Sequence, residues 1–577
     1  MNIQAILVSR FKAALASLDA SDAPVPVSKS TRPEFGEYQF NGAMGLAKIK
    51  RCPPREVAQQ ILDVVELDDI ADKCDIAGPG FINIHLSPDW LAQQANTTLH
   101  DARIGIAAQP EQTIVVDYSA PNLAKEMHVG HLRSTIIGDA VAKALEFMGH
   151  KVLRQNHMGD WGTQFGMLLA HLNDRLQANE VAETALSDLE DFYRAAKVRF
   201  DNEEGFADRA REYVVKLQGG DAQCLALWQN FIDVSIAHSE EVYHKLSVTL
   251  TRDDVMGESA YNHDLANVVS ELQAQGVVVE DAGAQVAFLE ELADKNGKPA
   301  VYIVQKSGGG YLYATTDLAA IRYRKSQLNA SRTLIFTDAR QALHFKQTEI
   351  VARKAGFLAA DDQYQHCPFG MMLGKDGKPF KTRTGGTVKL IDLLDEAVER
   401  AGALLATRDN DFSAESLADM ADKIGIGAVK YADLSKNRTT DYVFDWDAML
   451  SFEGNTAPYL QYAFTRIQSI FVKANVDISA CDAVIDIQAS QEKSLVTKLL
   501  QYQDTLEQLI DDAAPHVLCT YLYELASLYM KFYEACPILK EDVSAEQKAS
   551  RLAICALCSE TMGHGLGLLG IATLNKM

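Results

Sequence analysis

Two histidines separated by two residues, His128 and His131, are the side chains of this sequence that most suggest chemistry. Gly130 lies between them, and Lys125 lies three residues before His128. Two imidazoles, a cation and a glycine that leaves the backbone accessible could bind a polyphosphate and stabilise the charge that moves onto it during a transfer reaction. The alternative is a pair of histidines that caps a helix or fills a core. The pattern alone leaves both interpretations open.

The residues around the histidines predict the elements that would position them. An apolar strand at 114–116 precedes the pair, and an amphipathic helix follows from Leu132 to Leu145, with Gly149 as the expected stop. The histidines would then lie at a helix N-terminus, where free N–H groups and the helix dipole favour anions. A second strand at 151–156 completes a β-α-β unit. The glycine-rich turn after it would face the same ligand, because ligands of such sheets bind at the carboxyl ends of the strands.

Polar residues at other strand ends are further candidates for substrate contacts. A buried strand at 332–336 ends at a polar segment that includes Gln341. Glycines at 308–310 predict a hairpin turn, with a strand resuming at 311–313, so they do not form a phosphate loop. We expect Tyr313 and Asp317 just before a helix that begins near Asp317.

A glycine-rich loop at 370–386 carries four cations. They are Lys375, Lys378, Lys381 and Arg383. Such a loop could close as a positively charged lid over a leaving pyrophosphate. A solvated turn would have the same composition, and that alternative also stays open.

The composition bounds the class of protein. At 577 residues and 47% hydrophobic content the chain should form several domains. A net charge of −23 argues against non-specific binding to polyanions, although basic patches could still contact an RNA. Nine scattered cysteines predict no disulfide framework, and no apolar run reaches membrane-spanning length. We therefore expect a cytoplasmic protein.

At this point the sequence resembles a class I aminoacyl-tRNA synthetase and, within that class, the bacterial arginyl family over essentially the whole chain. Three motifs carry the resemblance. His128-Val129-Gly130-His131 is similar to the class signature, residues 119–127 resemble the arginyl form of the approach to it, and residues 371–377 resemble the segment that leads into the lysine loop.

The resemblance implies an α/β fold with four parts. A small α/β N-terminal domain at 1–108 would touch the outer corner of tRNA. A Rossmann-like parallel-sheet catalytic domain would span 109–390, with an acidic helical insertion at about 172–250. A helical connecting segment would span 391–454, and an all-helical domain at 455–577 would read the anticodon. Its helices are expected to include 498–510 and 517–533.

The reaction implied by the resemblance joins the carboxylate of L-arginine to the α-phosphate of ATP and then passes the arginyl group to the 3′ end of tRNA(Arg). His128 and His131 would contact the ATP phosphates, Gly130 would lie under the adenosine, and Met372 and Leu373 would also touch ATP. Mg²⁺ would accompany ATP, and no structural metal is expected. The resemblance places seven residues around arginine: Asp117, Ser119, Asn122, His131, Tyr313, Asp317 and Gln341. The enzyme is expected to be a monomer that does not bind membranes, and bound tRNA is expected to be required for activation.

The lysine loop departs from the class pattern. One alignment places Thr382 where the class has its catalytic second lysine, and the alternative alignment starts the pattern at Lys378 and places Lys381 there. Many arginyl enzymes lack that lysine and look to compensate with a lysine just before the histidine motif, which is the position of Lys125 here. We therefore list Lys125, Lys378 and Lys381 with the two histidines as catalytic candidates and expect Lys125 to have the largest role.

Two other functions compete with this interpretation. A cysteinyl or glutamyl synthetase would share the fold and both ATP motifs, although a cysteinyl enzyme would bring clustered zinc ligands, which the sequence lacks. A catalytically silent tRNA-binding paralogue would also share the architecture. The intact His128, Gly130 and His131 argue against that second alternative.

Overall fold

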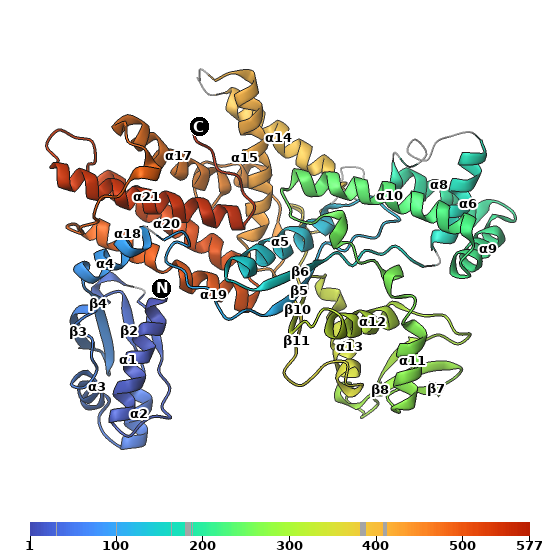
Figure 1. Cartoon of the computed structure of the whole chain (residues 1–577), viewed down its shortest axis with the longest axis horizontal. Coiled ribbons are helices and arrows are strands. Elements are labelled where there is room, and N and C mark those ends of the chain that lie inside the picture. The colour runs from blue at the N-terminus through green and yellow to red at the C-terminus, as the bar shows by residue number, and fades with distance from the viewer. Residues whose placement is uncertain are drawn as a thin grey trace.

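The structure is a computed structural model that describes residues 1–30, 32–99, 101–162, 164–178, 186, 188–380, 388–407 and 412–577. A parallel sheet lies in the middle of an elongated molecule (Figure 1). The N-terminal unit and the C-terminal helices lie on one side of this sheet, and a helical insertion and a second, antiparallel sheet lie on the other. Within the described ranges, no helix is both long and apolar enough to cross a membrane.

The N-terminal unit is a small α/β structure. Its antiparallel sheet has the strand order β1-β2-β4-β3. The elements are α1 (Ile3–Ser17), β1 (Val27–Lys29), η1 (Pro33–Phe35), β2 (Tyr38–Phe40), α2 (Ala43–Lys50), α3 (Pro54–Leu62), β3 (Ala71–Ala77), β4 (Phe81–Leu86) and α4 (Pro88–Leu99). Helix α1 buries residues spaced four apart, Leu7, Phe11 and Leu15, as expected for an amphipathic helix. Through α4 the unit packs against C-terminal helices α18 (Ser490–Leu500) and α21 (Ala545–Leu568).

The central sheet is parallel, as predicted. Its strand order is β11-β10-β5-β6. The strands are β5 (Thr113–Asp117), β6 (Lys151–Gln155), β10 (Arg332–Ile335) and β11 (Gln363–His366). Asp117 pairs with Ile335 on one side and with Gln155 on the other. From β5 the chain continues to β6 at one edge of the sheet, and from β10 it continues to β11 at the other edge. The direction of strand order therefore reverses between β5 and β10. Their carboxyl ends are therefore the expected ligand site.

Helix α5 (Leu132–Phe147) connects β5 to β6 and is buried on nearly every face, although an amphipathic helix was expected. The reason is that α15 (Ala414–Leu434), α19 (Tyr502–Asp512) and α21 pack on the faces that the sheet leaves uncovered. Polar residues Arg133 and Asp139 are consequently buried. Gly138 allows the closest approach to the strand end, because a Cβ atom there would lie 2.3 Å from the Cβ of Tyr118.

Between β6 and β10 the chain forms two further bodies. The helical insertion comprises α6 (Gln164–Gln177), α8 (Leu189–Asn202), α9 (Phe206–Gln218) and α10 (Ala222–Lys245). After η3 (Arg252–Asp254) and η4 (Glu258–Tyr261) come α11 (Leu265–Ala274), β7 (Val279–Asp281), β8 (Ala284–Leu289), η5 (Glu290–Leu292), β9 (Ala300–Gln305) and α12 (Tyr313–Ser326). The turn η6 (Ala339–Gln341) and helix α13 (Ala342–Lys354) follow β10 and connect it to β11. Strands β8 and β9 form a separate antiparallel sheet with β7 and belong to a second hydrophobic core.

The start of α12 corrects a second expectation. The hairpin turn at 307–310 leads back only to a single bridge between Gln305 and Tyr311, and a helix begins at Tyr313, where a continuing strand was expected. Thr315 causes this change, because its hydroxyl accepts the backbone N–H of Leu312 and donates to the carbonyl of Val304. Asp317 therefore lies one turn inside the helix.

The remainder of the chain is mostly helical. It comprises β12 (Met372–Leu373), α14 (Leu390–Ala406), α15, β13 (Tyr442–Val443), α16 (Trp446–Met449), α17 (Ala457–Ala474), η7 (Ile478–Ala480), α18, α19, α20 (His516–Ala535) and α21. The prediction of one continuous helix at 498–510 is wrong, because helix α18 ends before Gln501 and helix α19 begins after it. Strands β12 and β13 pair in parallel and connect the loop after Phe369 to this helical region.

Candidate active site

His128 and His131 lie at the start of α5, and their rings contact each other with centroids 4.0 Å apart. Nδ1 of His128 accepts the N–H of Gly130 at 3.0 Å, and Nδ1 of His131 accepts the N–H of His128 at 3.1 Å. The histidines therefore do cap the helix, as in the alternative interpretation. A nitrogen that accepts a backbone N–H carries no proton, so each neutral ring presents its N–H at Nε2. Capping thus leaves each ring one donor for a ligand.

The environment favours neutral imidazoles. Burial lowers the pKa of His131 to about 3, with a further contribution from His128. Burial also lowers the pKa of His128, and Lys125 adds to this effect while Glu190 opposes it. Gly130 is required by the capping geometry, because a Cβ atom there would lie 2.7 Å from Cε1 of His128. The two rings are therefore neutral and can serve as hydrogen-bond donors.

Lys125 lies beside this pair. Its side chain is exposed, and its Nζ lies 4.5 Å from the ring centroid of Tyr193 on α8. The helical insertion thus supplies a surface for the lysine. Because the charge of Lys125 helps to lower the pKa of His128, its ammonium group lies near the imidazole pair.

The lysine loop begins and ends next to described parts of the site. Phe380 donates its N–H to the carbonyl of Met372, and Val388 accepts the N–H of Val129 at 3.1 Å. The returning chain also pairs Lys389 with His128. Lys381, one of the catalytic candidates, falls within 381–387 and lies outside the described residues.

The other predicted ATP contacts lie on the described start of this loop. Lys378 is exposed in a turn that Asp376 stabilises by accepting its backbone N–H. Met372 is buried in the main core, and Leu373 is half-buried. The Met372 side chain therefore packs in the core, whereas the side chain of Leu373 is partly exposed.

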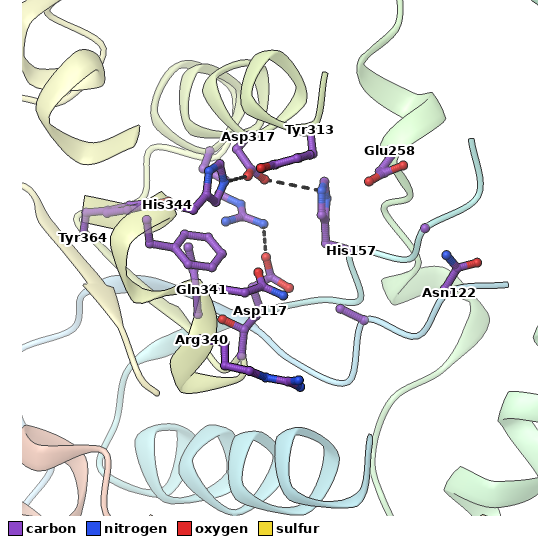
Figure 2. Close-up of a pocket in the computed structure, with 16 residues that line it drawn as sticks. Asp117, Asn122, His157, Glu258, Tyr313, Asp317, Arg340, Gln341, His344 and Tyr364 are labelled. Atoms are coloured by element: carbon purple, nitrogen blue, oxygen red, sulfur yellow. Dashed lines mark hydrogen bonds and ion pairs between the residues drawn. The ribbon is translucent and has the colours of Figure 1, made fainter. Parts of the chain in front are cut away.

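A cavity of about 580 Å³ lies at the carboxyl ends of the parallel strands (Figure 2). Five of the seven residues predicted around arginine line it: Asp117, Asn122, Tyr313, Asp317 and Gln341. The structure does not place Ser119 or His131 on its wall. The cavity and the histidine pair are close in space, because Ser134 of α5 accepts the backbone N–H of Ser119 at 2.9 Å.

One face of α12 supplies a wall of the cavity. Tyr313, Asp317 and Arg324 are spaced four and seven residues apart and all line it. Nε2 of His344 lies 2.5 Å from one oxygen of Asp317, and Nε2 of His157 lies 3.7 Å from the other (Figure 2). Asp317 therefore points into the cavity with an imidazole on each side.

Two further carboxylates lie at the cavity. Asp117 is buried and accepts from Nη2 of Arg324 at 2.5 Å. Glu258 lines the opposite side, where burial, together with Asp317 and Asp160, raises its pKa to about 8. The cavity therefore contains Asp117 paired with Arg324, Asp317 flanked by two imidazoles, and Glu258, whose charged form a bound cation would favour.

Ser119 has a different position from the one expected. Ser119 and Ala120 adopt left-handed φ values of 70° and 45°, which are strained for residues with side chains. The Ser119 hydroxyl lies 2.7 Å from the hydroxyl of Tyr243 on α10, and Tyr243 also accepts from Asn156. Ser119 thus holds the turn that exposes Ala120 and Asn122 to the cavity.

Several residues of the site were not found from the sequence. They are Glu258, Arg324, Arg340, His344, Phe345 and Tyr364 on the cavity wall and Tyr243 behind it. Arg324 had a signal, because it follows Asp317 by two helical turns. His344 had a weaker one, three residues after Gln341. Glu258 and Tyr243 had none, since each comes from a segment with no recognisable motif.

The sheet, the capping histidines and the adjoining cavity are together those of a class I synthetase catalytic domain, and residues 93–446 match the family described as "tRNA synthetases class I (R), catalytic domain". Residues 5–86 match "Arginyl tRNA synthetase N terminal domain", and residues 460–577 match "DALR anticodon binding domain". The chain belongs to the arginyl-tRNA synthetase family.

Full-length relatives and solved structures agree with this assignment. Arginine–tRNA ligases of Alteromonas mediterranea and Pseudoalteromonas atlantica are 70% and 69% identical, each over 100% of both chains. The arginyl-tRNA synthetase of Plasmodium falciparum superposes with a TM-score of 0.85 at 27% identity, covering 100% of this chain and 99% of that one. The Thermus thermophilus enzyme shares the fold, with a TM-score of 0.84 at 22% identity over 100% of both chains.

Proposed function

We propose that this protein is an arginine–tRNA ligase that binds its amino acid in the cavity beside α12. The observation that carries the proposal is the pair of carboxylates, Asp317 and Glu258, which face the same cavity with Tyr313 between α12 and the opening. A guanidinium is planar and presents several N–H donors, so two carboxylates on one cavity can each accept from it. Neutral amino acids would leave both carboxylates unpaired at a cost in free energy.

The other end of arginine would lie towards the strand ends. Asn122 and Gln341 offer amide groups there, and Asp117 offers a carboxylate that Arg324 keeps in place. An α-amino group can contact Asp117 and an amide oxygen, which leaves the α-carboxylate directed towards the start of α5. Ser119 supports this arrangement by holding the turn at 119–120, and His131 supports it by accepting the backbone N–H of His128 at the entry to α5.

The first reaction forms a bond between a carboxylate oxygen of arginine and the α-phosphorus of ATP, and the bond from that phosphorus to the bridging oxygen of pyrophosphate breaks. No protein nucleophile is needed, so positioning and charge stabilisation account for the acceleration. The Nε2–H groups of His128 and His131 would donate to phosphate oxygens as charge develops on them. Gly130, Met372 and Leu373 would lie along the adenosine.

The three lysine candidates for catalysis differ in the structural observations that support them. Lys125 acts on His128 in the structure, whereas Lys378 is exposed on the described part of the loop and Lys381 lies outside it. We therefore propose that Lys125 stabilises the transition state, with Lys378 and Lys381 following the leaving pyrophosphate. In the second step a ribose hydroxyl of the tRNA end attacks the arginyl carbonyl, and AMP leaves.

Mg²⁺ is proposed to arrive with ATP. In nucleotide-dependent enzymes this ion is usually held by phosphate oxygens and water with few protein ligands. Among the described residues there is no group of three His, Cys, Asp or Glu side chains that could hold a metal ion. We accordingly derive no step through a protein-bound metal.

The same assignment extends to tRNA and to the whole chain. We propose four domains, at 1–108, 109–390, 391–454 and 455–577, with the insertion of the second at about 172–250. The first domain would contact the outer corner of tRNA, and the last would contact the anticodon. The matching N-terminal and anticodon-binding families support this proposal. A monomeric, cytoplasmic enzyme is also proposed, and nine free cysteines are compatible with a reducing compartment.

One experiment tests the function directly. ATP–pyrophosphate exchange should be measured with each amino acid, with and without tRNA. Exchange that occurs with arginine alone and depends on tRNA supports the proposal. Exchange with another amino acid would indicate a different class I synthetase, and no exchange with any amino acid, even with tRNA, would favour a tRNA-binding paralogue without catalysis.

A further inference from the structure

Arg133, two residues after His131, is buried with 1% of its surface exposed. Its Nε lies 3.1 Å from Oδ2 of Asp433, which is at the end of α15 and 0% exposed. Its Nη1 donates to the carbonyl of Thr440 at 2.9 Å. The helix that follows the histidine pair is thus fixed both to the end of α15 and to the segment after it.

Thr440 immediately precedes the strand that holds the lysine loop. The next residue, Asp441, accepts the N–H of Met371 at 2.6 Å, and Tyr442 pairs with Met372 across β13 and β12. The guanidinium of Arg133 lies 5.2 Å from the ring centroid of Tyr442. One side chain therefore connects the helix of the histidines to the strand that leads towards Lys378.

The same helix start is connected to the returning end of the loop. Val129 donates to the carbonyl of Val388, and Leu390 donates to the carbonyl of Met127. The described flanks of the lysine loop are therefore both attached to the histidine segment, one by backbone pairing and the other through Arg133. A shift of α5 relative to β12 would change the distance between the two ATP-contacting segments.

Net stabilisation of the fold does not readily explain why the Arg133–Asp433 ion pair is buried. Removing two charges from water costs several kcal/mol per ion, and replacing such a pair by apolar residues of similar volume is often neutral or stabilising. The contacts of Arg133 instead specify a position, because a guanidinium directs its donors along fixed directions in one plane. Arg133 does not line the proposed arginine cavity.

We propose that Arg133, through Asp433 and Thr440, is a positioning residue that sets the register between the histidine pair and the lysine loop. The inference rests on the proposed ATP site at His128 and His131. It assigns to Arg133 no contact with substrate. Its effect is therefore expected on ATP-dependent steps and not on recognition of arginine.

The decisive variant replaces the pair by apolar residues, Arg133→Met with Asp433→Leu, so that no charge is left buried alone. A matched control exists in the C-terminal helices. Arg551 donates to Glu492 at 2.8 Å and to the carbonyl of Pro537 at 2.6 Å, and both side chains of this pair are buried. Arg551→Met with Glu492→Leu makes the same exchange far from the ATP-contacting segments. Thermal unfolding identifies the folded variants before kinetics are measured.

In tRNA-stimulated pyrophosphate exchange, the Arg133/Asp433 variant should lose about 10- to 100-fold in kcat/KM for ATP, the range expected when reacting groups are displaced by about 1 Å. Its KM for arginine should not change, and the Arg551/Glu492 control should resemble the unmodified enzyme in both. Arg133→Lys retains the charge without the planar fork and should show a smaller loss in the same parameter. This single variant keeps the test usable if the double variant does not fold.

Two results would overturn the inference. One is a folded Arg133/Asp433 variant whose ATP kinetics equal those of the control, and the other is an equal loss in the arginine KM and the ATP parameters. His128→Ala separates the inference from its premise. If His128→Ala leaves ATP kinetics unchanged, the proposed ATP site is wrong, whereas a large effect of His128→Ala with no effect at Arg133 rejects the positioning role alone.

Discussion

Nε2 of His344 lies 2.5 Å from Oδ2 of Asp317. The carboxylate that we assign to the guanidinium is therefore already held by a neighbouring imidazole, and His157 lies near its other oxygen. A side chain fixed in this way loses little conformational freedom when the substrate binds. Asp317 is consequently both oriented and partly compensated before arginine arrives.

Asp317→Asn should raise the KM for arginine by about 10- to 150-fold, because a hydrogen bond to a charged group contributes about 1.5–3 kcal/mol. It should also relax discrimination against citrulline, whose urea group has no charge. Pyrophosphate exchange with both amino acids measures the ratio. Asp281→Asn, at an exposed carboxylate on β7, is the control. An unchanged specificity ratio would remove Asp317 from this role.

Glu258 predicts a pH dependence of arginine binding. Its pKa is raised to about 8, so at neutral pH the free enzyme holds this group mainly protonated, and binding of a guanidinium must release the proton. The KM for arginine should fall as pH rises towards 8 and level off above it. Glu258→Gln should raise the KM and abolish this pH dependence. A profile that is the same in both proteins would exclude the assignment.

The same group predicts the pH dependence of stability. A carboxyl whose pKa is higher in the folded than in the unfolded protein binds more protons when folded, so its contribution decreases as pH rises from about 4.5 to about 8. Glu258→Gln removes this ionisation. The variant should therefore gain thermal stability relative to the parent as pH rises through this window, and a constant difference in melting temperature would contradict the raised pKa.

Lys125→Ala should lower the kcat of pyrophosphate exchange by about 10²- to 10³-fold, the usual loss when one group that stabilises transition-state charge is removed. The KM for ATP should change little. Lys378→Ala and Lys381→Ala are expected to have smaller effects on kcat. Equal or reversed losses among the three variants, measured with tRNA present, would reject the division of roles proposed here.

Tyr243→Phe tests whether the helical insertion supports the amino-acid site. The variant removes the hydroxyl that contacts Ser119 and Asn156, so the strained turn at Ser119 and Ala120 should relax. We expect kcat/KM for arginine to fall about fivefold, in line with about 1 kcal/mol for a hydrogen bond. Tyr213→Phe on α9, outside this network, is the comparison. Equal activity of the two variants would show that the turn is held by other contacts.

The sequence by itself determined the parallel sheet, the position of the histidines at a helix start and the segments that carry arginine and ATP candidates. Strand and helix periods are local, and a helix N-terminus has the same chemistry in any fold. For the same reason Asp117, Asn122 and Gln341 could be placed at strand ends before the structure was known. The capping alternative for His128 and His131 does not exclude the binding interpretation, since the observed capping contacts use only Nδ1 of each ring.

Only the tertiary structure decided which polar residues meet. Glu258 reaches the cavity from a short 3-10 turn, Ser119 turns away from it towards Tyr243, and Arg133 is buried because C-terminal helices cover α5. None of these outcomes has a local signal, because each depends on which surfaces of distant segments pack together. A pKa such as that of Glu258 is likewise set by burial and by neighbours that the chain brings together only on folding.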